Sequence, residues 1–384
     1  MERKNKIVIA AEIYPPDIGG PATYSERLFQ ELKKEGHDAV LVCYGTTGRT
    51  LHDEDGLVRI KRSVLKFPHY LRYMGTLFAI SKKADVIYAQ GPISSGVPAI
   101  IAGKLRRIRT VVKIVGDYAW ERARNKRKSE RDIDEFQSNP NGGLFVMLLR
   151  MLESRTVRHS DAVIVPSEYL RDMVIGWGAK SENVSVVYNS FHGNDEEAKS
   201  VYGDKSEENL VVSVGRLVPW KGFDTVIRAV HDLQNKIPNL RLEIIGGGPE
   251  KEKLEKLIKE LLLRQRVTIG PLSQEDALKR MARARVFVLN SGYEGLSHTI
   301  LEAFALGTPV IASRKGGNIE LIENNYNGIL VEYNNKEELK EAMLRLLLDE
   351  RIQNEFAFRS EEKIEKFSFE SMINGTKKIL FSDV

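Results

Sequence analysis

Two glutamates, Glu294 and Glu302, could each hold a diol, and seven residues separate them. An ionised carboxylate accepts two hydrogen bonds, and a sugar or ribose diol donates two. Between them, the amides of Gly295, Leu296 and Ser297 fall at an expected helix start, where unpaired N–H groups and the positive end of the helix dipole favour a phosphate. This arrangement suits a nucleotide diphosphate sugar, with one acid for the sugar hydroxyls and the other for the ribose.

A strand–loop–helix–strand unit at residues 285–313 positions these groups. The run Val286-Phe287-Val288-Leu289 is short, apolar and rich in β-branched residues, which predicts a buried strand. A helix follows the loop and is expected to end at Gly307 and Pro309. Because Val310-Ile311-Ala312 begins another strand, the unit belongs to a parallel sheet.

A purely structural alternative exists for both acids. Thr299 and Glu302 fit a capping box, and Glu294 could be a solvated loop acid. A cap at Thr299 leaves a helix of only about two turns before Gly307, which weakens this alternative.

The segment Glu294-Gly-Leu-Ser-His-Thr-Ile-Leu-Glu302-Ala resembles the E-x7-E motif of the retaining GT-B glycosyltransferases of family four. The resemblance implies an α/β protein with the GT-B fold, in which two Rossmann-like domains with parallel sheets face each other across a cleft. It also implies transfer of a hexose from a UDP- or GDP-linked sugar to a glycan, a lipid-linked or a small-molecule acceptor, as in polysaccharide biosynthesis.

Two cations lie in the segment Gly215-Arg216-Leu-Val-Pro-Trp-Lys221-Gly222, which follows the expected strand Leu210–Val214. Arg216 and Lys221 at the carboxyl end of a strand can neutralise a diphosphate leaving group. The alternative is that both are solvated loop cations. The segment also resembles the G-R-x-x-x-x-K-G motif of the same family.

Three further donor contacts come from the resemblance. Gly19 and Gly20, between the first strand and the first helix, resemble the glycine-rich loop that lies against the donor phosphates and the acceptor. The pair is not a G-x-G-x-x-G fingerprint, so no dinucleotide site is expected. Leu272, after Pro271, resembles the position that contacts the base.

Asp117 follows a buried strand, Thr110–Val115, at the edge where ligands of such sheets bind. It could bind a donor hydroxyl or accept the proton of the acceptor. It could equally cap the next helix. Many family members carry a histidine near this point, and this chain departs from that pattern.

The length of 384 residues favours two domains. We predict residues 1–190, joined by a returning segment 368–384, as the acceptor-side domain, and residues 191–367 as the donor domain. The single cysteine, Cys43, lies in an apolar run and is expected in the core. No signal peptide or membrane-spanning run is evident, so a cytoplasmic location is expected.

The net charge is +5, and the excess of Lys and Arg lies in the first half of the chain. The segment 122–131 is the densest basic run, and it could touch a membrane surface or an anionic acceptor, although a solvated loop is the simpler interpretation. Asp132-Ile-Asp134 mimics a metal-binding D-x-D sequence but follows no apolar strand, so we take it as surface charge. We expect no metal, cofactor or nucleic acid.

We therefore predict a metal-independent retaining glycosyltransferase. Arg216, Lys221 and the Gly295–Ser297 amides would stabilise the departing diphosphate, while Glu302 holds the ribose and Glu294 the sugar. A nucleotide-sugar epimerase and a non-catalytic nucleotide-sugar binding protein are the alternatives. The first would convert donor without acceptor, and the second would bind donor without turnover.

Overall fold

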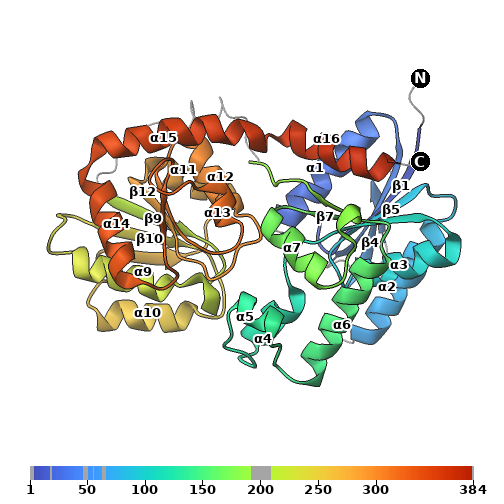
Figure 1. The fold of residues 1–384 in the computed structure, drawn as a ribbon, viewed down its shortest axis with the longest axis horizontal. Helices are drawn as coiled ribbons and strands as arrows, with labels where there is room; N and C mark the ends of the chain where they lie inside the picture. Colours follow the sequence, from blue (N-terminus) through green and yellow to red (C-terminus); the bar gives the residue numbers. More distant parts are fainter. Residues whose placement is uncertain are drawn as a thin grey trace. The chain divides into compact units, whose positions relative to one another are not determined.

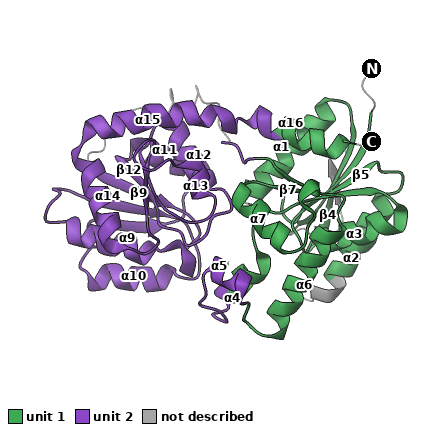
Figure 2. Cartoon of the chain, viewed as in Figure 1, with its two compact units in different colours: residues 1–123, 140–187, 373–384 green, residues 124–139, 188–372 purple. Residues whose placement is uncertain are grey.

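The structure is a computed structural model that describes residues 4–17, 20–45, 51–54, 56–62, 66–191 and 209–382. The chain forms two compact units, which Figure 2 shows in different colours. Unit 1 consists of residues 1–123, 140–187 and 373–384, and unit 2 of residues 124–139 and 188–372.

Unit 1 is built on an eight-stranded sheet in the order β3-β4-β2-β1-β5-β6-β7-β8. Only β3 pairs antiparallel, with β4; the other pairs are parallel. The strands are β1 (Lys6–Ala10), β2 (Asp38–Gly45), β3 (Leu51–Glu54), β4 (Leu57–Lys61), β5 (Val86–Gln90), β6 (Arg109–Lys113), β7 (Ala162–Val165) and β8 (Val184–Val186). The apolar residues of β1, β5, β6 and β7 are almost fully buried, as in parallel sheets covered on both faces.

Helices cover this sheet on both sides, with α1 and α16 on one side and α2, α3 and α6 on the other (Figure 1). The helices of unit 1 are α1 (Gly20–Lys34), α2 (Lys66–Ile80), α3 (Gly96–Arg106), most of α4 (Tyr118–Asn125), α6 (Leu144–His159), α7 (Glu168–Gly176), the short η1 (Ser181–Asn183) and most of α16 (Phe369–Phe381).

Unit 2 is built on a six-stranded parallel sheet in the order β11-β10-β9-β12-β13-β14. Its strands are β9 (Leu210–Val214), β10 (Arg241–Ile245), β11 (Val267–Gly270), β12 (Val286–Leu289), β13 (Val310–Ser313) and β14 (Ile329–Val331). The order reverses between β9 and β12, and such a point is where ligands of doubly wound sheets bind.

Two hydrophobic clusters pack on opposite faces of this sheet. Val211 of β9 joins the cluster under α9 (Phe223–Leu233), α10 (Lys251–Glu260) and α14 (Lys336–Leu348). Its neighbours Leu210 and Val212 join the other cluster, under α11 (Gln274–Arg283) and α12 (His298–Ala305). This alternation follows from the two-residue period of a strand. The remaining helices are α5 (Ile133–Ser138), η2 (Pro219–Lys221), α13 (Asn318–Leu321), α15 (Glu350–Ile364) and η3 (Glu365–Phe367).

The predicted α/β class with parallel sheets is confirmed. Cys43 is fully buried in β2, as expected for a core residue. The domain limits at residues 190 and 367 stay a prediction, and the structure groups residues 124–139 with unit 2. Within the described ranges, no helix is long and apolar enough to cross a membrane.

Candidate active site

Four of the predicted residues lie in unit 2 on two neighbouring loops. Arg216 and Lys221 follow β9, while Glu294 and Glu302 lie in and beyond the loop that follows β12. Because β9 and β12 are adjacent parallel strands, these loops leave the same edge of the sheet at the point where the strand order reverses. The sheet thereby brings together groups that are more than seventy positions apart in the sequence.

The ammonium of Lys221 forms an ion pair with Oε1 of Glu294. Both side chains are only 14% exposed, so the pair is largely removed from water. A pair in such surroundings interacts more strongly than a surface pair, and removing one partner leaves the other charge uncompensated. The fold thus joins a cation and a carboxylate that the sequence assigned separately to the diphosphate and the sugar.

Asn290 fixes the Lys221 loop against the end of β12. Its Nδ2 donates to the carbonyl of Gly222 at 3.0 Å, and the amide of Gly292 donates to the carbonyl of Trp220 at 2.7 Å. Gly222 has φ +56°, and a Cβ there would lie 2.4 Å from the carbonyl oxygen of Asn290. Only glycine fits this position easily, which explains the glycine after Lys221.

A second glycine pair supports the backbone of Glu294. The amide of Gly317 donates to the carbonyl of Glu294 at 2.9 Å. A Cβ on Gly316, at φ +56°, would lie 2.2 Å from that same carbonyl oxygen, and one on Gly317 would lie 2.2 Å from the carbonyl oxygen of Gly295. Neither this pair nor Asn290 was among the residues predicted from sequence, although a Gly-Gly pair in the loop after a strand signals a close backbone approach.

The helix start after Glu294 differs from the capping-box alternative. Ser297, not Thr299, is the N-cap of α12, and its Oγ accepts a hydrogen bond from the amide of Ile300 at 3.3 Å. The capping box at Thr299 was therefore wrong. Among the described residues, nothing accepts from the amides of Gly295, Leu296 and Ser297, which leaves these donors open to a ligand.

Asn189 ties this amide loop to the start of unit 2. Its buried Nδ2 donates to the carbonyl of Leu296 at 3.3 Å. The hydrogen bond orients the Leu296 peptide with its carbonyl directed toward Asn189. From sequence Asn189 had no expected role in the site, because this contact spans more than a hundred positions.

Glu302 lies in the middle of α12 and is half-buried. Burial raises its pKa from the usual 4.5 to about 7, because a desolvated carboxylate is less stable than the neutral acid. Within the described part of the chain, its carboxylate makes no ion pair or hydrogen bond. A poorly solvated acid with free acceptor positions is suited to binding the hydroxyls of a ligand.

Arg216 and Leu272 complete the unit 2 predictions, and both side chains are exposed. The amide of Leu217, next to Arg216, donates to the carbonyl of Gly247 at 3.0 Å. Gly246 lies so close that a Cβ would meet the carbonyl oxygen of Gly215 at 1.9 Å. The glycine run after β10 therefore packs against the Arg216 loop.

Asp117 lies in unit 1 and is almost fully buried. Its Oδ1 accepts from the amide of Trp120 at 2.6 Å, so the capping alternative is confirmed. Nearby, Glu153 accepts from the amide of Tyr118 at 2.8 Å, and burial together with the charge of Asp117 raises the pKa of Glu153 well above its usual value. Contact of Asp117 with a donor or an acceptor stays a prediction.

Of the glycine pair Gly19 and Gly20, the structure describes only Gly20. Gly20 is the first residue of α1, whereas Gly19 lies outside the described residues. Their role at the donor phosphates stays a prediction.

The D-x-D sequence pairs with a lysine. Asp132 caps α5 by accepting from the amide of Glu135 at 2.8 Å, and Lys315 lies 3.2 Å from Asp132 and 3.6 Å from Asp134. Over the described ranges, no group of three or more His, Cys, Asp or Glu side chains could hold a metal ion.

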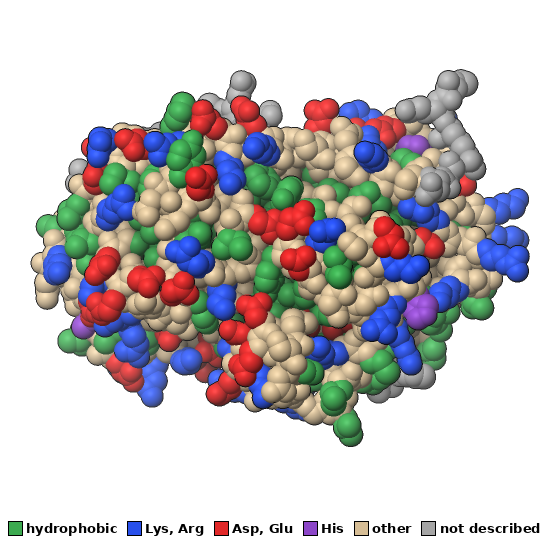
Figure 3. Space-filling model, viewed as in Figure 1, with side chains coloured by type: hydrophobic (Ala, Val, Ile, Leu, Met, Phe, Trp, Pro, Cys, Tyr) green, Lys and Arg blue, Asp and Glu red, His purple; other side chains and the backbone are tan. Residues whose placement is uncertain are grey.

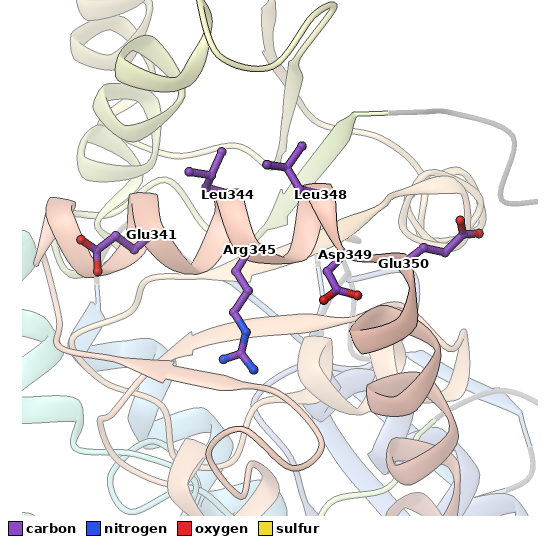
Figure 4. Close-up of a pocket in the computed structure, with 6 residues that line it drawn as sticks. All are labelled: Glu341, Leu344, Arg345, Leu348, Asp349 and Glu350. Carbon is purple, nitrogen blue, oxygen red and sulfur yellow. The ribbon is translucent and has the colours of Figure 1, made fainter.

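A surface pocket of about 500 Å³ lies elsewhere in unit 2, along α14 and the start of α15 (Figure 4). Leu344 and Leu348 extend from one side of α14, and Arg345 from the other. The pocket contains none of the predicted site residues, so its size does not connect it with the chemistry of Glu294 and Glu302.

Comparison with known protein families gives matches to both halves of the chain. Residues 19–190 match the Glycosyl transferase 4-like domain, and residues 194–363 match Glycosyl transferases group 1. The chain belongs to the group 1 glycosyltransferases. The second match contains the loops of Arg216, Lys221 and Glu294, so the family suggested by the E-x7-E spacing is confirmed.

Individual relatives of this group 1 glycosyltransferase are distant. An uncharacterised glycosyltransferase of Methanocaldococcus jannaschii is 29% identical over 58% of this chain and 59% of its own length. A GDP-mannose-dependent alpha-(1-6)-phosphatidylinositol monomannoside mannosyltransferase of Mycobacterium tuberculosis is 34% identical over 37% of this chain and 39% of its own. The aligned region thus spans less than two thirds of each of these relatives.

The GT-B fold is confirmed by solved structures. One of them is Anabaena HepE in complex with UDP-glucose, which superposes on this chain with a TM-score of 0.73. The match covers 98% of each chain, and the sequences are 18% identical. At this identity the likeness shows the fold alone.

Proposed function

We propose that this chain is a retaining glycosyltransferase that moves a hexose from a UDP- or GDP-linked sugar to a glycan, lipid-linked or small-molecule acceptor. The observation that carries the proposal is the largely buried pair of Lys221 and Glu294, directly before the open amides at the start of the helix that contains the desolvated Glu302. The name of one relative supports the donor class, since that enzyme depends on GDP-mannose.

In the proposed reaction the diphosphate occupies the amides of Gly295–Ser297, with Arg216 and Lys221 beside it. Glu302 accepts from the ribose diol, and Glu294 accepts from a sugar hydroxyl. The bond between the anomeric carbon and the phosphate oxygen breaks while the acceptor oxygen bonds to the same face of that carbon. The acceptor proton passes to the departing diphosphate, so no protein nucleophile is required. We also propose that Leu272 contacts the base, and that Gly19, Gly20 and Asp117 contact the donor or the acceptor.

Arg216, Lys221 and the amides supply the charge stabilisation that a metal gives in other phosphate-transfer sites. We therefore propose metal-independent turnover. A cytoplasmic location and a lipid-linked acceptor at a membrane surface are part of the same proposal.

The test is slow hydrolysis of a panel of UDP- and GDP-sugars in EDTA without acceptor. We expect one donor to release its nucleotide diphosphate. Lys221→Ala should lower that rate about 10²- to 10³-fold, because it removes a contact with the developing negative charge.

Lys251→Ala is the matched control. Lys251 also pairs with a glutamate, Glu255 at 3.7 Å, but on the exposed surface of α10. Its rate should equal that of the unaltered chain. Equal losses in both variants, or no binding of any donor, would contradict the proposal, and donor binding without turnover would favour the non-catalytic alternative. Conversion of the donor sugar without release of nucleotide would favour the epimerase.

A further inference from the structure

Helix α6 of unit 1 carries apolar side chains on its outer surface. Of the sixteen large hydrophobic side chains that are exposed among the described residues, five lie in its first half: Leu144 (87% exposed), Phe145, Met147, Leu148 and Met151. Leu144, Leu148 and Met151 follow helical spacing, so they form one stripe. Exposure of this many neighbouring apolar side chains is unusual for a surface that faces only water.

The neighbouring helices continue the pattern. Helix α2 packs against α3, and α3 against α6. Four more of the exposed apolar side chains lie on α2 and α3, namely Leu71, Phe78, Ile101 and Leu105. Figure 3 shows hydrophobic and basic side chains together over the region where these helices lie in Figure 1.

The exposed charged side chains within these three helices are all positive. Their sequences contain one acidic residue, Glu153, which is 1% exposed and accepts hydrogen bonds from backbone amides inside the unit. The exposed charged side chains within the helices are all basic, namely Arg72, Lys104, Arg155 and Arg158, and Lys82, Lys83 and Arg107 follow α2 and α3. Asp161, two residues after α6, is exposed, and its Oδ2 accepts a hydrogen bond from the amide of Thr110 at 2.7 Å. Across the described ranges, Lys82, Lys83, Lys104 and Arg107 make no ion pair.

We propose that this helical layer is a docking surface for an anionic lipid bilayer. The first half of α6 enters the boundary between headgroups and acyl chains, and the basic side chains of α2 and α3 contact lipid phosphates. Apolar side chains beside Lys and Arg, with no exposed acid within the helices, are what an interfacial helix needs. A nucleic acid would use the cations but not Leu and Met, and protein interfaces are usually poor in lysine, so the bilayer fits the composition best.

This surface differs from the basic run at residues 122–131, which the sequence suggested for a membrane contact. Within that run, Arg127 pairs with Glu250 at 3.5 Å and Arg131 with Glu135 at 3.1 Å. It has no exposed large apolar side chain among the described residues. Helix α6 has the exposed apolar side chains that residues 122–131 do not have.

The test is co-sedimentation of the full chain with vesicles of phosphatidylcholine alone or with one third phosphatidylglycerol. We expect binding to the anionic vesicles that weakens with salt. Leu144→Glu with Leu148→Glu should lower affinity at least tenfold. Lys104→Glu with Arg107→Glu should lower it at least roughly 25-fold at low salt, since each basic residue near such a surface contributes about fivefold. Phe358→Glu with Leu348→Glu, exposed apolar residues of unit 2, is the matched control and should bind normally.

A fluorescence measurement separates insertion from adsorption and does not depend on the Glu variants folding. Met147→Trp should shift to shorter wavelength with anionic vesicles, whereas Phe358→Trp should not shift. The proposal is overturned if either unit 1 double variant binds vesicles as the unaltered chain does. It is also overturned if the emission of the Met147→Trp variant does not shift, or if the chain self-associates through α6 and does not bind vesicles. None of these measurements uses the donor. They therefore test membrane docking independently of the proposed transfer reaction.

Discussion

The proposed contact of Glu302 with the donor ribose would make donor binding depend on pH. A neutral carboxyl accepts hydrogen bonds from a diol less well than a carboxylate, and this group ionises only around pH 7. We expect donor affinity to rise about tenfold from pH 6 to pH 8, following the ionised fraction. Calorimetric titration of the donor at several pH values measures this, and Glu302→Gln should bind weakly with a flat pH profile. A sloping profile in the Gln variant would assign the effect to another group.

The same residue gives an opposite trend for the unliganded protein. Because its folded pKa is raised from 4.5 to about 7, its contribution to stability is complete below pH 4.5 and is lost as pH rises through about 7. Glu302→Gln should therefore gain stability over the unaltered chain at pH 8 by at most on the order of 3 kcal/mol. Denaturant titrations at two pH values would show it.

At the scale of elements, the loops after β9, β12 and β13 support one another. Hydrogen bonds join Asn290 to the Lys221 loop, and the amide of Gly317 to the carbonyl of Glu294. The chemical groups are thus held by backbone contacts between loops rather than by any single loop. Such positioning matters because small displacements of catalytic groups cost much activity.

Gly316→Ala tests this support. A side chain is opposed both by the φ of +56° and by the carbonyl oxygen of Glu294, which would lie 2.2 Å from the new Cβ. We expect a stability loss of about 1–3 kcal/mol and weaker donor hydrolysis as the Glu294 backbone shifts. Thermal unfolding and the hydrolysis assay measure the two effects.

Gly247→Ala is the control for stability, because a Cβ there meets nothing within 4 Å and its φ is not positive. It should unfold within about 0.5 kcal/mol of the unaltered chain. A Gly316→Ala protein as stable as this control would show that the loop adapts freely and that the proposed support is absent.

At the scale of the whole molecule, the end of the chain returns to the unit that contains its beginning. Residues 373–384 belong to unit 1 (Figure 2). In α16, Leu380 is fully buried, Thr376 bonds to the hydroxyl of Tyr24 at 3.1 Å, and Lys377 pairs with Glu35. The fold of unit 1 is therefore complete only when the last helix has been made.

Leu380→Ala should destabilise unit 1 by about 2–5 kcal/mol, the usual cost of a cavity in a packed core. Scanning calorimetry should show one unfolding transition at lower temperature. Lys378→Ala, an exposed change on the same helix, should leave the profile unaltered. If Leu380→Ala also leaves it unaltered, α16 contributes little to unit 1.

The sequence alone determined the α/β class, the strand and loop that carry Glu294, and the loop that carries Lys221. These features are local, because an apolar run followed by glycine and polar residues fixes a strand end within a few positions. Helix limits depend on capping contacts that the sequence leaves open: the possible cap at Thr299 is replaced by Ser297.

Only the tertiary structure decided which distant groups meet and which side chains face solvent. The Lys221–Glu294 pair, the desolvation of Glu302 and the contact of Gly316 with the Glu294 carbonyl depend on neighbours far away in the chain. The exposed stripe of α6 is the converse case, since its apolar spacing by itself predicts burial. Periodicity shows that one side of a helix is apolar, but what covers that side depends on how the sheet and its other helices pack.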